Sequence, residues 1–264
     1  MNCVSGSARL FADTLGNSGS AVVLLHGLGG SRHAWCHIPR ELSRSHRVIT
    51  PDLRGCGDSE RGAETYSFGL LAQDLLAILD ASDTRVCHIV GHSLGGVIAQ
   101  HFLTRHQDRC ASAVLVSTSS RVGEKAAVSW RRLADIVAAK GLSRSDLGTA
   151  RGFSDSFLER QPELVRTLSE IAAASDPKVY AEQARIAADY DYTEALGSVT
   201  RPVLIMQGLA DKMTSPGGSV ILSRAIHGST LEMVEGAGHN LHLEMGDAFT
   251  GRIARFFETV DCQS

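Results

Sequence analysis

Six short apolar runs recur along the chain, and the stretches between them carry apolar residues at a helical spacing. Runs that are apolar throughout, such as residues 21–25 (AVVLL), are typical of strands buried on both faces of a parallel sheet. Residues 230–234 (TLEMV) mix apolar and polar positions, which indicates a half-exposed strand. Strands are therefore predicted at residues 21–25, 47–50, 86–90, 113–116, 202–206 and 230–234, with an edge hairpin within 7–15.

Amphipathic helical patterns separate these predicted strands. Within residues 67–80, for example, Leu71, Leu75 and Ile78 recur at the spacing that puts them on one side of a helix. Helices are predicted at residues 34–45, 67–80, 96–105, 216–225 and 246–259. Strands that alternate with helices predict an α/β fold, with a mostly parallel, twisted sheet flanked by helices.

The pattern changes over residues 121–196, between the predicted strands at 113–116 and 202–206. These are the sixth and seventh strands of the sheet when the edge hairpin is counted as two. This segment holds four helical patterns and no strand-like run: 126–137, which Gly141 ends, a weaker one within 143–151, one that begins at Pro162, and one after Asp176-Pro177. We predict that residues 1–120 and 197–264 form the core and that 121–196 form a helical lid over the carboxyl ends of the strands. A helical layer packed elsewhere, without a gating role, is the alternative.

Composition and charge exclude several classes of protein. The 264 residues are 43% hydrophobic and 21% charged, with a formal net charge of -3, which predicts no nucleic-acid or anionic-membrane partner. No apolar run is long enough to span a membrane, and the first residues lack the pattern of a signal peptide. Six scattered cysteines without a C-x-x-C pair favour reduced thiols in a cytoplasmic protein and no zinc site.

The main candidate for chemistry is residues 91–95 (G-H-S-L-G), which lie between a predicted strand and a predicted helix. A G-x-S-x-G motif in this context is a nucleophile elbow, in which the serine stands exposed above the sheet. Gly91 and Gly95 allow strand and helix to approach closely. The Leu94 N–H, at the start of the helix, could stabilise an oxyanion beside Ser93. A glycine-rich turn that happens to hold a serine is the alternative.

A second glycine-rich loop, residues 26–30 (H-G-L-G-G), follows the strand at 21–25. Three glycines in five residues indicate a backbone that comes close to another group. We predict that the Leu28 N–H completes an oxyanion hole with that of Leu94. His26 is expected to hold this loop by hydrogen bonds rather than to take part in chemistry.

Two further loops at the predicted strand ends supply a base and an acid. A serine hydroxyl needs an adjacent base, which in turn needs an orienting carboxylate. Asp211 follows the strand at 202–206, and His239 follows the strand at 230–234 within a glycine-flexed loop. Ligands bind at the carboxyl ends of the strands of such sheets, so Ser93, Asp211 and His239 are predicted to share one rim.

The loop at residues 52–59 (D-L-R-G-C-G-D-S) offers competing carboxylates. Asp52, Arg54 and Asp58 could be catalytic, but clusters of this kind more often form an internal salt-bridged loop, which we favour.

These motifs together resemble those of the α/β-hydrolase superfamily, over nearly the whole chain. Residues 26–30 resemble its oxyanion loop, 52–59 its D-x-R-G-x-G-x-S loop, 91–95 its nucleophile elbow, 208–211 its acid loop and 236–239 its histidine loop. The order Ser, Asp, His along the chain is that of the superfamily. Within it, the sequence is most similar to the branch of lid-bearing small esterases and 3-oxoadipate enol-lactonases.

The resemblance implies a serine hydrolase that cleaves a small or medium carboxylic ester or lactone, without metal or organic cofactor. A C–C bond hydrolase or lyase on the same residues and a non-catalytic ligand receptor are the alternatives. Aromatic residues are few, and those near the predicted site are expected to line the substrate pocket together with neighbouring side chains. The predicted pocket residues are Trp35, Trp130, Tyr190, Met213 and His242. The oligomeric state is left open.

Overall fold

The computed structural model describes residues 1–143 and 149–263, and it confirms the predicted α/β fold. One sheet of eight strands runs in the order β1-β2-β4-β3-β5-β6-β7-β8. The first two pairings, β1 with β2 and β2 with β4, are antiparallel, and the remaining pairings are parallel. The strands are β1 (Asn2–Ser5), β2 (Ala8–Leu15), β3 (Ala21–Leu25), β4 (Arg47–Pro51), β5 (Cys87–His92), β6 (Cys110–Val116), β7 (Val203–Gly208) and β8 (Thr230–Val234).

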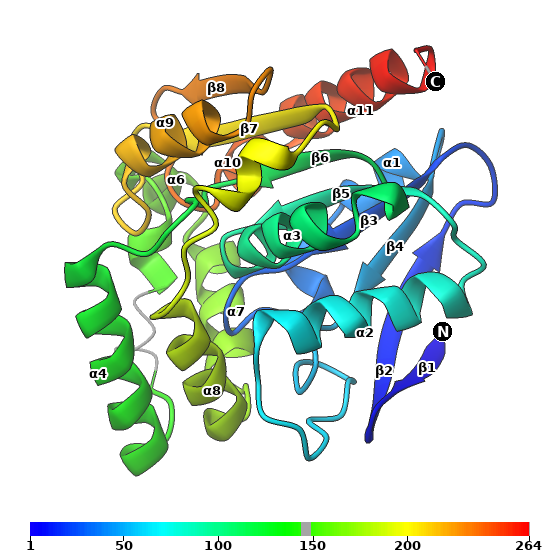
Figure 1. The fold of residues 1–264 in the computed structure, drawn as a ribbon. Coiled ribbons are helices and arrows are strands. Elements are labelled where there is room, and N and C mark those ends of the chain that lie inside the picture. The colour runs from blue at the N-terminus through cyan, green and yellow to red at the C-terminus, as the bar shows by residue number, and fades with distance from the viewer. Residues whose placement is uncertain (144–148, 264) are drawn as a thin grey trace.

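Helices cover both faces of this sheet (Figure 1). α2 and α3 lie on one face with α9, whereas α1 and α11 lie on the other. The core helices are α1 (Ile38–Leu42), α2 (Phe68–Ala81), α3 (Leu94–Arg105), α9 (Pro216–Ala225), α10 (Leu241–Met245) and α11 (Asp247–Asp261). The single-turn 3-10 helices η1 (Arg32–Trp35), η2 (Gln107–Arg109) and η4 (Ala195–Ser198) lie in the connections.

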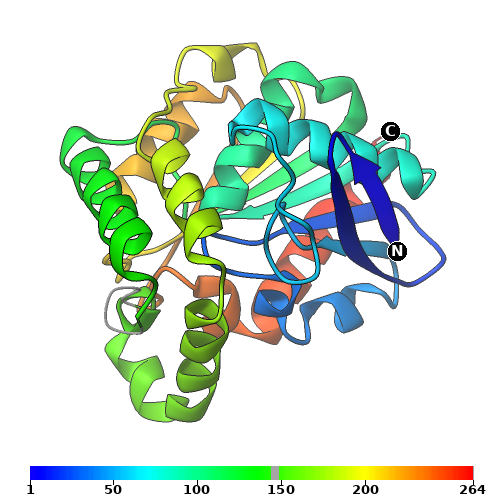
Figure 2. The same cartoon turned by 90° about the horizontal axis from the view of Figure 1, so that it is seen from below.

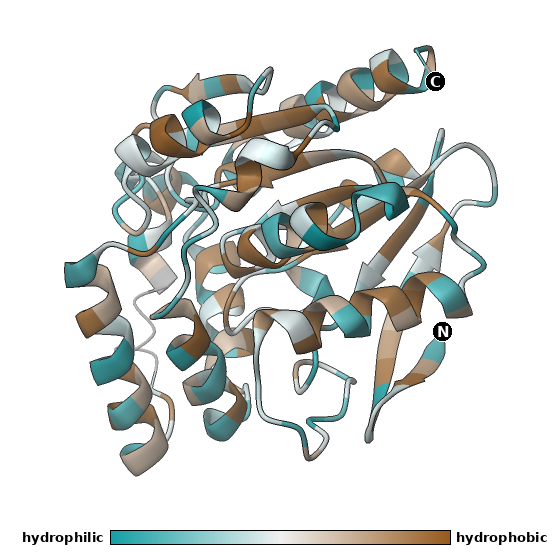
Figure 3. Cartoon of the chain, in the orientation of Figure 1, coloured by the Kyte–Doolittle hydropathy of each residue, from teal (hydrophilic) through white to brown (hydrophobic). Residues whose placement is uncertain are grey.

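The central strands are buried on both faces, which explains their continuous apolar runs. In β3, Val23 and Leu25 pack in the core beneath α2 and α3, while Val22 and Leu24 pack in the core beneath α1 and α11. Figure 3 shows the same pattern, with hydrophobic colour concentrated along the central strands. A parallel sheet with helices on both faces leaves its strand ends as the place where polar loops can gather.

The segment between β6 and β7 is helical. It contains α4 (Glu124–Lys140), η3 (Thr149–Gly152), α6 (Asp155–Arg160), α7 (Pro162–Ala173) and α8 (Pro177–Ala187). α4 packs against α8 around Ala134, Val137 and Ala184, and this pair stands beside the sheet rather than on either face (Figure 2). Side chains of α7 and α8 line a cavity together with the loops that follow β3 and β5. Part of α7 and α8 therefore lies at the rim where these two strands end.

Several boundaries differ from the sequence prediction. The helix predicted at 34–45 is instead η1 followed by α1, because Cys36 takes a positive φ of 49° between them and a new helix begins at Ile38, with Pro39 in its first turn. Of the weak helix predicted within 143–151, residues 144–148 lie outside the described residues and 149–152 form η3. α6 and α10 were not predicted, since helices of six and five residues are too short to show a periodicity.

Buried ion pairs hold the loop at 52–59, as the salt-bridge interpretation expects. The Arg54 side chain is fully buried and donates to both carboxylate oxygens of Asp74 on α2, at 2.8 and 2.6 Å. It also donates to Glu64 at 2.8 Å and to the Ser5 carbonyl at 2.9 Å. Asp52 and Asp58 pair with Arg32 on η1. Arg54 therefore ties the loop to the first strand and to α2.

Replacing Arg54 should destabilise the fold strongly. Arg54→Met leaves the buried Asp74 carboxylate without its partner, a change that typically costs about 3–5 kcal/mol of the free energy of unfolding. Urea denaturation followed by circular dichroism measures this loss. Arg9→Met is the control, because it removes an exposed ion pair with Glu60 and should leave the midpoint near that of the wild type. Equal midpoints for both variants would contradict the structural role of Arg54.

Candidate active site

Ser93 stands at a strained turn between β5 and α3. Its φ is 54° and its ψ -115°, a region that non-glycine residues rarely occupy and that often marks functional sites. The two flanking glycines are required by space. A Cβ on Gly91 would lie 2.4 Å from the Gly95 carbonyl oxygen, and one on Gly95 would lie 2.3 Å from the Leu25 carbonyl oxygen. The strand, the turn and the helix are thus packed backbone to backbone.

His239 and Asp211 are hydrogen-bonded to each other at the rim of the sheet. The distance from His239 Nδ1 to Asp211 Oδ2 is 2.9 Å, and both side chains are almost completely buried. Asp211 Oδ1 accepts from the backbone N–H groups of Met213 at 2.7 Å and Thr214 at 2.9 Å. With Asp211 as a carboxylate acceptor, Nδ1 carries the ring proton of neutral His239, which leaves Nε2 free to accept one.

Hydrogen bonding keeps Asp211 ionised. Burial by itself raises the pKa of this carboxyl, but the hydrogen bond and charge of His239 and the further donors lower it more, so the net pKa lies below the usual range. One of these donors is Gln207, whose Nε2 lies 2.9 Å from Asp211 Oδ2 and whose Oε1 accepts from Ser219. Sequence analysis missed Gln207, although it is a buried polar residue in an otherwise apolar strand.

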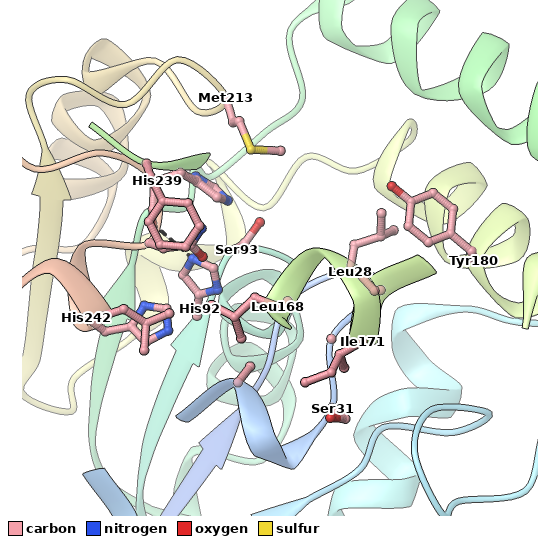
Figure 4. Close-up of a pocket in the computed structure, with 18 of the residues that line it drawn as sticks. Leu28, Ser31, His92, Ser93, Leu168, Ile171, Tyr180, Met213, His239 and His242 are labelled. Atoms are coloured by element: carbon pink, nitrogen blue, oxygen red, sulfur yellow. Dashed lines mark hydrogen bonds between the residues drawn. The ribbon is translucent and has the colours of Figure 1, made fainter. Parts of the chain in front are cut away.

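Ser93 and His239 line the same cavity (Figure 4). Within the described part of the chain, the Ser93 hydroxyl does not hydrogen-bond to the His239 ring. Such bonds are often long before a substrate binds and tighten in the complex. The structure therefore brings the three predicted residues to one rim, with the His–Asp pair already formed.

The loop after β3, which holds Leu28 of the predicted oxyanion hole, makes a tight turn. Gly30 N–H donates to the Gly27 carbonyl at 3.1 Å, which closes a tight turn around Leu28. His26 is fully buried and holds this turn, since its Nδ1 lies 2.9 Å from the Gly27 carbonyl and its Nε2 accepts from the Leu53 N–H at 3.0 Å. Among the described residues, neither Leu28 N–H nor Leu94 N–H donates to a protein acceptor. Leu28 lines the cavity beside Ser93, and Leu94 lines a smaller pocket that Ser93 also lines.

Two further histidines surround His239. His92 Nε2 lies 3.0 Å from the His239 carbonyl oxygen, and the His92 ring centroid is 4.9 Å from that of His239 and 4.5 Å from that of His242. Burial lowers the pKa of both neighbours, that of His242 to about 3, and the adjacent histidines add to the effect. His92 and His242 are therefore neutral near pH 7 and add no charge beside His239. The part played by His92 was not predicted.

Two chambers meet at Ser93. The first is a mostly apolar cavity of about 130 Å³, and the second is a wider, more polar opening of about 650 Å³. The predicted pocket residues Trp130 and Met213 line both chambers, His242 lines the first, and Tyr190 lines the second. The first chamber is also lined by apolar residues outside the predicted pocket set, namely Phe153, Leu168, Ile171, Ala172, Tyr180 and Leu243.

The prediction that Trp35 lines the pocket is wrong. Trp35 is fully buried in the core beneath α1 and α11, and its ring lies behind His242 at a centroid distance of 4.9 Å. Its neighbour Ala34 faces the cavity instead. The one-residue difference arises because η1 turns the larger side chain toward the core, where it buries more apolar surface.

The described residues form neither a metal site nor a membrane-spanning helix. Over residues 1–143 and 149–263, no group of three or more His, Cys, Asp or Glu side chains is arranged to hold a metal ion. In the same residues, no helix has the length and apolar character needed to cross a membrane. All six cysteines are free thiols.

The fold and the rim residues together define a class of α/β proteins with a serine elbow and a His–Asp pair at the carboxyl ends of a parallel sheet. Residues 20–245 match the family model described as the alpha/beta hydrolase fold. The chain belongs to the α/β-hydrolase family, as the sequence motifs predict.

Similar proteins include hydrolases of esters and lactones. The chain is 28% identical to 3-oxoadipate enol-lactonase 2 of Acinetobacter baylyi, over 87% of this chain and 85% of the relative. It is also 28% identical to a pimeloyl-[acyl-carrier protein] methyl ester esterase of Neisseria meningitidis, over 90% and 92%. Among solved structures, a thermophilic esterase from Thermogutta terrifontis superposes with a TM-score of 0.91 at 26% identity, over 98% and 99% of the two chains.

Replacing Ser93 should abolish turnover and leave the fold intact, because the side chain contributes little packing at the turn. For Ser93→Ala we expect a loss of kcat on the order of 10⁴-fold or more, as for other nucleophiles of this kind. Hydrolysis of a p-nitrophenyl ester and thermal unfolding measure the two effects. Retention of more than about a tenth of the activity would rule out Ser93 as the nucleophile.

Asp211→Asn should lower kcat nearly as much as Ser93→Ala does. The amide cannot hold His239 in the tautomer that leaves Nε2 free, and the same change in a serine protease lowers kcat by about 10⁴-fold. The control is Asp58→Asn, which alters a carboxylate that pairs with Arg32 in the 52–59 loop. If the Asp58 variant is inactive while the Asp211 variant is near wild type, the acid is wrongly assigned.

Proposed function

We propose that this protein is a serine hydrolase that cleaves a small or medium carboxylic ester or lactone through an acyl-enzyme on Ser93. The observation that carries the proposal is the buried hydrogen bond between Asp211 and His239 beside the cavity that Ser93 lines. The esterases and lactonases among the similar proteins support the same class of substrate.

In the proposed mechanism, Ser93 Oγ attacks the substrate carbonyl and transfers its proton to His239 Nε2. The Leu28 and Leu94 N–H groups stabilise the oxyanion of the tetrahedral intermediate. His239 then gives the proton to the leaving oxygen, and the C–O bond breaks to leave the acyl group on Ser93. Water gives a proton to His239 and attacks the acyl carbonyl; the bond to Ser93 Oγ then breaks, His239 returns the proton to Oγ, and the carboxylic acid leaves. Asp211 stabilises the imidazolium in both halves of the reaction.

The lining of the first chamber supports an uncharged group of modest size on the substrate. Its described lining residues include no Lys, Arg, Asp or Glu, and its histidine neighbours His92 and His242 are neutral near pH 7. A carboxylate placed there would lose its hydration without gaining a charged partner, which is unfavourable. We therefore propose that an apolar arm of the substrate occupies this chamber and that the wider chamber takes the remainder.

We also propose that residues 121–196 act as a lid that shapes this cavity. Support comes from Trp130 on α4, Leu168 and Ile171 on α7, and Tyr180 on α8, which all line the first chamber.

We further propose a cytoplasmic location for the protein. The free thiols at all six cysteines agree with it.

A panel of p-nitrophenyl esters of graded acyl length, together with simple lactones, tests the proposed function. We expect saturable hydrolysis of esters with short or medium chains, and covalent labelling of Ser93 by a small organophosphate. Labelling without turnover of any ester or lactone would favour C–C bond cleavage. Absence of both labelling and turnover would favour a ligand receptor.

Truncation of a lid residue should change selectivity rather than abolish activity. Trp130→Ala enlarges both chambers, so it should shift preference toward bulkier acyl groups by about 10–100-fold, which is the scale of discrimination in an apolar pocket. Chain-length profiles of kcat/KM measure the shift, and Ser93 should still react with the organophosphate. The matched control is Val128→Ala, an exposed position on the same helix. If the profile of Trp130→Ala equals that of the wild type, the lid does not shape the pocket.

A further inference from the structure

Glu244 on α10 is turned back toward the loop that carries His239. Its Oε1 accepts from the Gly238 N–H at 2.9 Å, and Gly238 is the residue just before His239. The same oxygen accepts from the Ser154 N–H at 3.1 Å, and its Oε2 accepts from the Ser154 hydroxyl. One carboxylate thus receives three hydrogen bonds, from two segments that are far apart in the sequence.

Ser154 belongs to the helical segment between β6 and β7, where it is the N-cap of α6. Its hydroxyl oxygen accepts from the Phe157 N–H while its proton is donated to Glu244. A second connection between the same two segments is made by Asn240, two residues after Gly238. Asn240 donates to the Gly152 carbonyl from its backbone N–H at 2.8 Å and from its side chain at 3.2 Å. The residues on both sides of His239 are therefore fastened to residues 152–154.

The contact between the His239 loop and residues 152–154 is too close for a side chain at position 238. A Cβ on Gly238 would lie 2.8 Å from Glu244 Oε1 and 2.9 Å from both the Phe153 carbonyl carbon and the Ser154 nitrogen. Gly238 and Ser154 are buried, so without the carboxylate their N–H groups would lack a partner in a place that water reaches poorly. The loop would then move to satisfy them, and His239 would move with it.

Asp211 fixes the ring of His239 but not its backbone. The Asp211 bond joins the imidazole to the end of β7, whereas the backbone around His239 is held by Glu244, by residues 152–154 and by His92. We propose that Glu244 is a positioning residue that fastens the His239 loop to the helical segment, so that the place of the base depends on that segment. This inference rests on the proposed function, in which His239 is the base.

A positioning role predicts a loss in kcat without a matching change in KM. Glu244→Leu removes the acceptor, and we expect kcat to fall about 10–100-fold while KM stays within about threefold, because Glu244 does not line either chamber. The rate of Ser93 labelling by a small organophosphate should fall in parallel, since it needs the same base but little of the pocket. Glu244→Gln keeps an oxygen for the two N–H groups, so it should recover most of the activity.

The matched control is Glu235→Leu, an exposed residue near the start of the same loop, which should behave as the wild type. All values of kcat are expressed per site titrated with the organophosphate, so that a partly unfolded preparation does not lower them. A wild-type kcat per titrated site in Glu244→Leu, or a loss confined to KM, overturns the inference. Failure of the glutamine to recover activity above the leucine variant also overturns it.

If Glu244→Leu does not fold, Ser154→Ala tests the positioning role of Glu244. It removes the hydroxyl donor on the helical segment and keeps the Gly238 bond, so it should lower kcat about 3–10-fold at unchanged KM. An unchanged kcat in Ser154→Ala overturns the inference. The proposed function fails in a different way, because the wild type itself would then turn over no ester or lactone.

Discussion

The close backbone packing at the turn of Ser93 is the constraint on which the rest of the site depends. A Cβ on Gly91 or Gly95 would collide with a backbone carbonyl oxygen, and the Ser93 N–H donates to the Val116 carbonyl at 2.9 Å. These contacts fix β3, β5, β6 and α3 relative to one another. Because the turn cannot relax, the serine keeps its positive φ of 54°.

Around the Ser93 turn, the site combines the negative charge of Asp211 with neutral and mostly apolar surroundings. Asp211 stays ionised because donors surround it, whereas burial keeps His92 and His242 uncharged. In such a low-dielectric setting, the interaction between Asp211 and a protonated His239 is stronger than it would be in water. The proposed chemistry therefore relies on electrostatics set by burial and hydrogen bonding rather than on additional charged groups.

Local sequence determined the fold and the identity of the rim residues. The continuous apolar run of β3 marks a strand covered on both faces, and the glycines around Ser93 reflect a turn where no Cβ fits. Asp211 and His239 could be placed because each follows a strand, and parallel strands end at one edge. These inferences use only spacing and local sterics, and both are properties of the chain alone.

Tertiary structure decided which side chains meet. Trp35 and Ala34 are neighbours in sequence, and only the turn of η1 determined that the smaller one faces the cavity. The contact of Glu244 with Ser154 joins residues 90 positions apart, and no periodicity links them. The rotation of a short helix and the approach of distant loops depend on how the whole core packs, because each side chain settles where it buries the most apolar surface with its polar atoms paired.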